Sequence, residues 1–369
     1  MKTRRRQYVS RPSSTSTTIS TDLITEILLR LPVKSIARCR CVSKLWNSTL
    51  RDPLFTELFL TMSSARPRLL FSLVEDRELC FFSAPQGESS STVAADYHLQ
   101  FTLDDSYKVC GHVRGLVCLA DQETAHVICK PSTGQLFPLP KVKTKKTFSV
   151  YSFLGFDPTD EEFKVLNITS GVQHRVLTLG TQTLEWRMIE CGIGRHYPNR
   201  NSDGICINGG VYYIARFHEP VVAIVCFNVR LEKYRVINEA EDMHLLGSST
   251  VVNYKGKLGV LTKESRRFEL WVLEDAETHQ WSKNVYVLPQ SLWENVAGED
   301  ELYIVGVVGG TDEVVLWPED VCDPLYVYYY NMERNTLRRV EIKGMDAVSD
   351  HTAYMTLDYV EDVKLMNYV

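Results

Sequence analysis

The sequence lacks any apolar run long enough to cross a membrane. No stretch approaches the roughly 18 consecutive apolar residues that a membrane-spanning helix needs. The basic N-terminus also lacks the apolar segment of a secretory signal. The 369 residues are 44% hydrophobic and 24% charged, which is typical of a soluble globular chain with two domains or one small and one large unit. We therefore expect no membrane partner.

Cysteine is too sparse for a disulfide scaffold, and the ten cysteines do not have the spacing of a zinc site. Cys39 and Cys41 are two residues apart on a predicted helix, so they face different directions. We interpret the ten as reduced thiols that mostly behave as small buried hydrophobes. This interpretation predicts no metal, no cofactor and a location in the cytoplasm or nucleus.

The motifs of several common enzyme classes are missing as well. The nine histidines include no HExxH pair, and neither GxxxxGK[ST] nor GxSxG occurs. The carboxylates between residues 157 and 162 fit an exposed turn better than a catalytic pair. We therefore predict no catalytic residues, with an enzyme as the alternative from a different functional class.

Positive charge is concentrated at the N-terminus. Residues 1–18 carry five basic residues, no acidic ones and many Ser and Thr, which predicts a disordered tail. The Arg4-Arg5-Arg6 run leaves a nuclear localisation signal open. Residues 61–369 carry 30 basic and 42 acidic residues. An acidic main region argues against a nucleic acid partner, because phosphate contacts need clustered Lys and Arg.

Residues 19–60 contain short apolar stripes with helical spacing. Leu23, Ile27 and Leu31 recur every four residues with further apolar residues beside them, which predicts an amphipathic helix. Ser20 or Thr21 can cap its start.

Two more short helices follow in the prediction. Pro32 cannot continue the first helix but suits the start of the second, whose apolar stripe includes Val33 and Ile36. Ser43 is suited to cap a third helix, which Pro53 ends. Three short helices bury only a small core, so we expect the unit to need a partner.

The segment from residue 19 to residue 55 resembles an F-box. The shared stretches are EILLRLP, VKSIARCRCVSKLW and the closing DPLF, and they align without a gap. The family pattern usually opens with Leu-Pro, where this chain has Ile19-Ser20. The resemblance implies that residues 19–60 bind a Skp-type adaptor and, through it, a cullin scaffold. It implies adaptor contacts for Ile19, Leu23, Ile24, Ile27, Leu31, Pro32, Val33, Ile36, Val42, Leu45 and Trp46.

From about residue 66 the pattern changes to short β-strands without useful helical periodicity. Runs of four to seven apolar residues alternate with polar turns, and Asn208-Gly209, Lys255-Gly256 and residues 298–300 predict hairpins. The spacing of the repeated strand–turn–strand stretches, 46 to 57 residues, is typical of a β-propeller with four strands in each unit. The six stretches begin near Cys80, Val127, Val176, Ile224, Leu270 and Val327.

Residues 66–369 resemble the F-box-associated interaction domain that follows F-boxes in a large plant family. The motifs GLVCL, LGFDPTDEEFKVL and AYMTLDYV carry the resemblance through their order, and each repeated unit is similar to a kelch repeat in outline. The resemblance implies a target-binding surface and no catalysis. The expected fold is α+β with segregated domains, a three-helix F-box followed by an all-β propeller of about six units.

Three loops carry the charged and aromatic residue types of protein interfaces. They are residues 191–204, 216–220 and 316–324. The alternative is that these loops are only solvated and have no binding role. The candidate target-binding residues are Arg195, His196, Tyr197, Arg200, Arg216, His218 and Trp317.

Together the two resemblances imply a substrate-recognition subunit of a Skp–cullin–F-box type ubiquitin ligase. Its F-box would hold the adaptor and its propeller an unidentified target protein, so that a target lysine comes within reach of the conjugating machinery. The alternatives are a propeller enzyme with an incidental helical N-terminus and an F-box scaffold that does not promote degradation.

Closure of the propeller is a further expectation. An open ring of blades would leave strand edges exposed. We therefore predict that residues 352–360, the last strand-like segment, pair with the blade built from residues 68–83.

Overall fold

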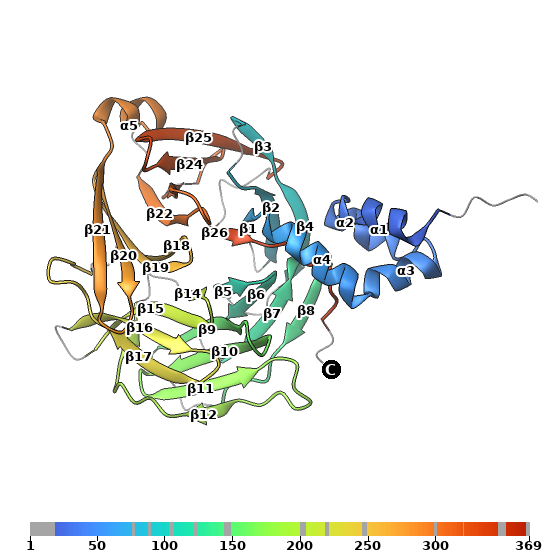
Figure 1. Ribbon diagram of the computed structural model, residues 1–369, viewed down its shortest axis with the longest axis horizontal. Helices are drawn as coiled ribbons and strands as arrows, with labels where there is room; N and C mark the ends of the chain where they lie inside the picture. The colour runs from blue at the N-terminus through green and yellow to red at the C-terminus, as the bar shows by residue number, and fades with distance from the viewer. Residues whose placement is uncertain are drawn as a thin grey trace, which may run out of the picture.

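Figure 1 shows a ring of β-sheets with a small helical unit at one side. The structure is a computed structural model that describes residues 19–75, 78–87, 90–102, 107–121, 124–143, 149–199, 204–217, 221–245, 249–298, 301–319, 321–345 and 352–366. The predicted disordered tail, residues 1–18, lies outside the described residues. Within those ranges, no helix is both long and apolar enough to span a membrane.

Four helices make up the N-terminal unit: α1 (Thr21–Leu29), α2 (Val33–Cys39), α3 (Lys44–Arg51) and α4 (Pro53–Ser64). Two of the expected caps are confirmed, because the side chains of Ser20 and Ser43 accept hydrogen bonds from the backbone N–H groups of Leu23 and Trp46. The sequence predicted three helices and missed α4. Pro53 ends α3 but also starts α4, where a residue without an N–H fits the first turn.

Six sheets, here called blades 1 to 6, form the ring seen in Figure 1. Blade 1 contains β26 (Thr352–Tyr359), β1 (Arg68–Glu75), β2 (Glu78–Pro85) and β4 (Asp96–Thr102). Blade 2 contains β5 (Lys108–Val113), β6 (Leu116–Ala120), β7 (His126–Lys130) and β8 (Gln135–Pro138), with the short helix η1 (Pro131–Thr133) before β8. Blade 3 contains β9 (Val150–Asp157), β10 (Glu162–Thr169), β11 (Gln173–Thr178) and β12 (Arg187–Ile189).

The other three blades continue the ring. Blade 4 contains β13 (Tyr197–Pro198) and β14 (Ile205–Ile207), which both pair with β15 (Gly210–Arg216), followed by β16 (Val222–Asn228) and β17 (Lys233–Ile237). Blade 5 contains β18 (Thr250–Tyr254), β19 (Lys257–Glu264), β20 (Arg267–Asp275) and β21 (Gln280–Val287). Blade 6 contains β22 (Leu302–Val307), β23 (Glu313–Pro318), β24 (Tyr326–Asn331) and β25 (Thr336–Lys343), and β3 (Thr92–Ala94) pairs with β25 in parallel.

The core of the propeller is divided among the junctions between blades. In β16, Ile224 packs toward blade 5, whereas its neighbour Val225 packs toward blade 3. Successive strand residues point to opposite faces, and both faces are covered, so the middle strands are almost continuously apolar. The described residues form one buried cluster at each of the six junctions.

The predicted six-fold repeat is confirmed, since each repeated stretch begins in the third strand of a blade. The last interval is the longest because α5 (Gln290–Val296) is inserted between β21 and β22. No helix was predicted there. None of the seven α5 residues is fully buried, although Leu292, Trp293 and Val296 pack against the core between blades 5 and 6. Of the hairpin turn expected at residues 298–300, only Gly298 is described, and it follows α5; residues 299 and 300 lie outside the described ranges.

Two of the predicted hairpin turns are confirmed. Asn208 and Gly209 have φ values of +48° and +82°, and Lys255 and Gly256 have values of +51° and +83°. Positive φ at both central residues is the geometry of the tight turn that joins twisted antiparallel strands.

The predicted closure is confirmed as well. Strand β26 pairs antiparallel with β1, so the last strand of the chain completes the first blade. At the same junction, the Asp358 carboxylate accepts hydrogen bonds from the Gln86 side chain and from the Gly309 N–H. The ring is therefore closed by the pairing of β26 within blade 1, and side-chain contacts join blade 1 to blade 6.

All ten cysteines are free thiols, but they are less buried than the sequence suggested. Cys118 and Cys129 are buried, Cys41 and Cys322 are exposed, and the other six are half-buried.

Candidate binding surfaces

An exposed apolar stripe runs along α1 of the helical unit. Ile19, Leu23 and Ile27 follow one another at intervals of four residues, and all three are exposed, Leu23 by 57% and Ile27 by 46%. The neighbouring face of α1 is also apolar but buried, through Ile24 and Leu28. The helix is thus apolar over a wider sector than its own unit covers, which is typical of a partner site.

The other helices add to this surface. Exposed large apolar residues gather in the unit, since residues 19–58 hold seven of the seventeen in the described chain. Besides the α1 stripe, these are Val42, Leu45, Leu54 and Leu58. Leu54 and Leu58 lie on α4, which the sequence analysis did not assign to a helix. We call the seven residues the apolar helix surface.

Three of the predicted adaptor contacts are not exposed in the free protein. Ile24, Val33 and Ile36 are buried inside the helical unit, where they form its own small core. Leu31 and Trp46 are half-buried and pack against that core. The exposed members of the predicted set are Ile19, Leu23, Ile27, Pro32, Val42 and Leu45.

A second candidate surface lies where the chain passes from blade 3 to blade 4. The Arg195 guanidinium lies over the Tyr197 ring, 5.3 Å from its centroid, and donates a hydrogen bond to the Ser170 carbonyl. Tyr197 on β13 is directly opposite Arg216 on β15. The structure therefore brings three of the predicted target-binding residues together, and an aromatic ring beside guanidinium groups is typical of interface hot spots.

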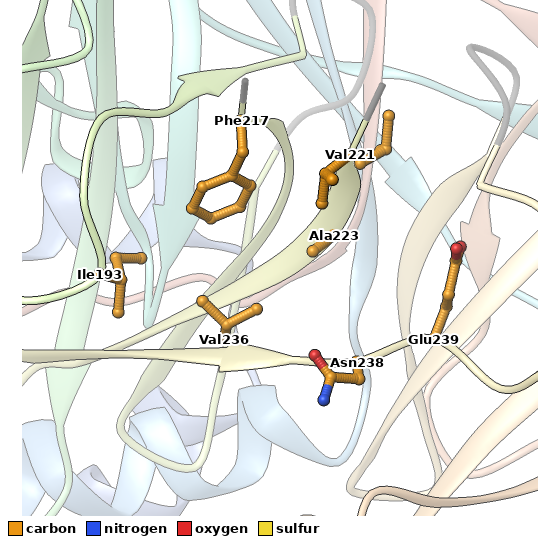
Figure 2. A pocket seen from close by; sticks show the side chains of 8 residues that line it. Ile193, Phe217, Val221, Ala223, Val236, Asn238 and Glu239 are labelled. Atoms are coloured by element: carbon orange, nitrogen blue, oxygen red, sulfur yellow. The ribbon is translucent and has the colours of Figure 1, made fainter. Parts of the chain in front are cut away.

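A cavity of about 450 Å³ lies next to these residues. In Figure 2, Ile193, Phe217 and Val236 gather on one side, whereas Asn238 and Glu239 lie on the other. Val221 and Ala223 line it as well, and Val221 is exposed. A mainly apolar cavity with polar groups at one side is typical of a binding site.

Two predicted target-binding residues do not lie at the surface. His196 is fully buried, with its Nε2 atom 2.8 Å from the Tyr213 hydroxyl. Trp317 is buried between blades 1 and 6, where it packs against Phe71. Both were selected as loop aromatics, but they fill the core. Arg200 and His218 lie outside the described residues, so their roles stay predictions.

The sequence analysis missed the apolar members of the second surface. Ile193 lies within the loop that was singled out, but attention went to its charged and aromatic neighbours. Phe217 lies within the second predicted loop, Val221 directly follows that loop, and Val236 lies on β17. In the sequence, these positions are apolar residues near strand ends. Core residues show the same pattern, so the sequence could not distinguish the two.

Comparison with known proteins agrees with both parts of this fold. Residues 18–58 match the family model of the F-box domain, and residues 68–362 match that of the F-box associated beta propeller domain. The chain is also similar to F-box protein DOR of Arabidopsis thaliana, with 48% identity over 373 residues that cover 94% of each chain. The chain belongs to the plant F-box proteins with an F-box-associated propeller.

Other members of this family are nearly as similar. The F-box protein At3g61340 of Arabidopsis thaliana is 44% identical over 94% of this chain and 93% of its own length. The F-box protein At5g65850 of the same plant is 43% identical over 99% of this chain and 95% of its own length. The apolar helix surface thus belongs to the F-box, and the Arg195–Tyr197–Arg216 group belongs to the associated propeller.

Proposed function

We propose that this chain is the substrate-recognition subunit of a Skp–cullin–F-box type ubiquitin ligase. F-box domains generally bind Skp-type adaptors. The observation that carries the proposal is the apolar helix surface, which the rest of the described chain leaves exposed. The propeller then holds a target so that a target lysine lies near the conjugating machinery, and this chain contributes proximity without a chemical step. The ten free thiols suit the reducing cytoplasm or nucleus, where we expect the protein to act.

The first test is calorimetric titration of the full chain with a Skp-type adaptor. In the complex with the adaptor, Leu23→Asp and Ile27→Asp would each bury a carboxylate without a partner, which costs several kcal/mol. We expect each substitution to weaken binding by at least about 100-fold. Leu231→Asp is the matched control, because Leu231 is also an exposed leucine but lies in the turn between β16 and β17.

The outcomes of this titration separate the alternatives. If both α1 variants bind the adaptor as tightly as the wild type does, the adaptor must bind another surface. A wild type that does not bind at all, although its propeller is folded, would remove the ligase proposal and favour the enzyme alternative. If the adaptor binds but the amount of target protein does not change when the proteasome or the cullin is inhibited, the scaffold alternative is favoured.

The second surface is the proposed target site. The Arg195–Tyr197–Arg216 group supplies charge and an aromatic ring, and the adjacent cavity supplies an apolar recess. Affinity purification under proteasome inhibition would identify target proteins. Replacing all three residues with Ala should abolish their capture but retain adaptor binding. Capture that survives the triple replacement would contradict this assignment.

A further inference from the structure

Three ligand-type side chains meet at the junction between blades 3 and 4. His174 lies on β11, whereas Cys191 and His196 lie in the loop that joins β12 to β13. One ring nitrogen of each histidine and the Cys191 Sγ all lie within 4.8 Å of one another. The Cys191 Sγ and the His196 Nδ1 are 3.9 Å apart. Two ligands of one tetrahedral zinc ion lie about 3.5 Å apart, so only a small contraction is required.

Two tyrosine hydroxyls orient the histidine rings. The Tyr234 hydroxyl is 2.8 Å from the His174 Nδ1, and the Tyr213 hydroxyl is 2.8 Å from the His196 Nε2. A proton on the His174 Nδ1 that is donated to the Tyr234 hydroxyl leaves the lone pair of His174 on Nε2. The His196 Nδ1 lies 3.1 Å from the Gly194 carbonyl oxygen, which only accepts, so metal binding requires the His196 proton to move to Nε2, where the Tyr213 hydroxyl accepts it. Metal-binding histidines almost always donate their second N–H to a supporting group in this way.

The His174 Nε2 is the observation that points to a ligand. His174 is only 1% exposed, and this nitrogen has no hydrogen-bond partner among the described residues. A buried polar atom without a partner is destabilising and rare in folded proteins. An ion between His174, Cys191 and His196 would give this lone pair its partner.

We propose that His174, Cys191 and His196 form a zinc site that fastens the loop between β12 and β13 to blade 3. Two imidazole nitrogens and one thiolate are a donor set that Zn²⁺ prefers. Binding releases the thiol proton of Cys191, and both histidines bind as neutral rings. The Gly194 carbonyl, which accepts a hydrogen bond from the Cys191 thiol at 3.5 Å, or a water beside half-exposed Cys191, completes four ligands.

The site would fix the loop on which part of the second surface is built. Ile193 lines the cavity, and Arg195 and Tyr197 flank the ligand His196 on either side. Phe217, also in the cavity wall, packs against the His196 ring with centroids 5.4 Å apart. A bound ion would therefore hold these side chains in one arrangement. The metal site itself does not depend on the ligase proposal.

The test uses the full chain, stripped of metal with a chelator and then titrated with Zn²⁺ alone. We expect one tightly bound ion per chain and a melting temperature raised by a few degrees, because an ion that binds only the folded state stabilises it. Co²⁺ in place of Zn²⁺ should give the charge-transfer band of a thiolate ligand. Absence of stoichiometric zinc binding, or a cobalt spectrum without that band, would overturn the proposal.

Variants locate the ion among the ten cysteines. Cys191→Ser should weaken zinc binding by more than the roughly 10–100-fold that is typical of losing a supporting hydrogen bond. Tyr234→Phe, which removes such a bond from His174, should weaken it by about 10–100-fold. Cys322→Ser, at an exposed cysteine between β23 and β24, is the matched control and should bind like the wild type. If Cys322→Ser loses as much affinity as Cys191→Ser, the ion is elsewhere and the proposal is wrong.

Discussion

Gly171, in the turn between β10 and β11, allows blade 3 to approach the loop that carries His196. Its φ is +66°, and its carbonyl accepts a hydrogen bond from the His196 N–H at 3.2 Å. A Cβ at this position would lie 2.6 Å from the His196 carbonyl oxygen. A side chain here would therefore both strain the turn and push the loop away.

Gly171→Ala should destabilise the propeller by more than Gly134→Ala does. Gly134 also has a left-handed φ, +71°, but a Cβ there meets nothing within 4 Å. The control therefore carries only the conformational cost, about 1–2 kcal/mol. Urea unfolding of the two variants measures the difference. If both variants lose the same free energy of unfolding, the loop moves away from the added methyl group without a measurable cost.

His126 gives the molecule a pH dependence that can be measured. The side chain is 1% exposed, and its Nε2 lies 2.7 Å from the Ser152 hydroxyl of blade 3. Burial lowers its pKa from 6.5 to about 4, while the Thr124 carbonyl and Asp121 act in the opposite direction. Because the folded pKa is depressed, neutral His126 stabilises the fold fully above pH 6.5, and this contribution is lost as the pH falls toward 4.

His126→Gln should flatten the loss of stability between these two pH values. The removed contribution has an upper bound of about 3 kcal/mol, since each pKa unit corresponds to about 1.4 kcal/mol. Some loss remains, because His98 and His112 have pKa values lowered by burial in the same way. The free energy of unfolding, measured from pH 7.5 to pH 4.5 in both proteins, checks this. A variant with the slope of the wild type would contradict the assignment.

At the residue scale, the sequence distinguished apolar from polar positions but not exposed from buried ones. Ile27 and Ile36 both belong to predicted apolar stripes, yet Ile27 is exposed and Ile36 is buried. The difference arises from how four helices pack, which a stripe on one helix does not contain. His196 was misjudged for a related reason, because the strand that covers it is distant in the sequence.

At the scale of elements, β26 shows how a local irregularity directs a side chain. Met355 and Leu357 pack toward blade 6, whereas Tyr359, two residues further, packs toward blade 2. The pairing with β1 shifts register here, and Asp358 has a φ of +55°. This bulge turns Tyr359 to the other face, where its hydroxyl lies 2.6 Å from the Ser132 hydroxyl.

Two adjacent substitutions on β26 should act in opposite directions. Leu357→Ala removes a buried side chain from the junction with blade 6 and should cost about 2–5 kcal/mol. Thr356→Val removes a buried hydroxyl that has no hydrogen-bond partner among the described residues and should stabilise the propeller, by up to about 1–3 kcal/mol. Thermal unfolding of the two variants is the measurement. A lower melting temperature for Thr356→Val would show that the Thr356 hydroxyl does form a hydrogen bond in solution.

The elements that could be predicted are those with a strong local signal. The period of the blades, the Asn-Gly and Lys-Gly turns and the closing strand all followed from the sequence, because each blade repeats the same strand pattern. Helix α5 and the bulge at Asp358 could not be predicted. The first has no fully buried residue, and the second depends on contacts with Gln86 and Gly309, far away in the chain.

At the scale of the whole molecule, the last described residues join the F-box to the propeller. After β26, Asp362 forms a buried ion pair with Lys130 of blade 2, and the Lys130 ammonium also donates to the Lys364 carbonyl. Val363, between them, inserts into the core of the helical unit. Arg40 of the helical unit donates to the Val363 carbonyl. This segment, residues 360–366, thus contacts both the helical unit and the ring and holds one against the other.

Val363→Asp should uncouple the two parts without opening the ring. Val363 is 1% exposed and surrounded by Leu, Ile and Phe side chains of the helical unit, so a carboxylate there would lose its hydration and disrupt that apolar contact. The blade junctions do not include this residue, and the melting of the propeller should change little. Hydrogen exchange should become faster in residues 19–64, and small-angle X-ray scattering should show a larger radius of gyration.

The matched control for that experiment is Val287→Asp, at an exposed valine on blade 5, which should leave both measurements unchanged. Val363→Ala, which removes two methyl groups without adding charge, should give an intermediate effect. In the proposed ligase, adaptor and target would still bind to Val363→Asp, because neither surface includes Val363. Ubiquitin transfer would slow, since a loosely held target spends less time near the conjugating machinery. Unchanged scattering and exchange in Val363→Asp would mean that contacts such as that of Lys34 with Tyr97 hold the unit by themselves.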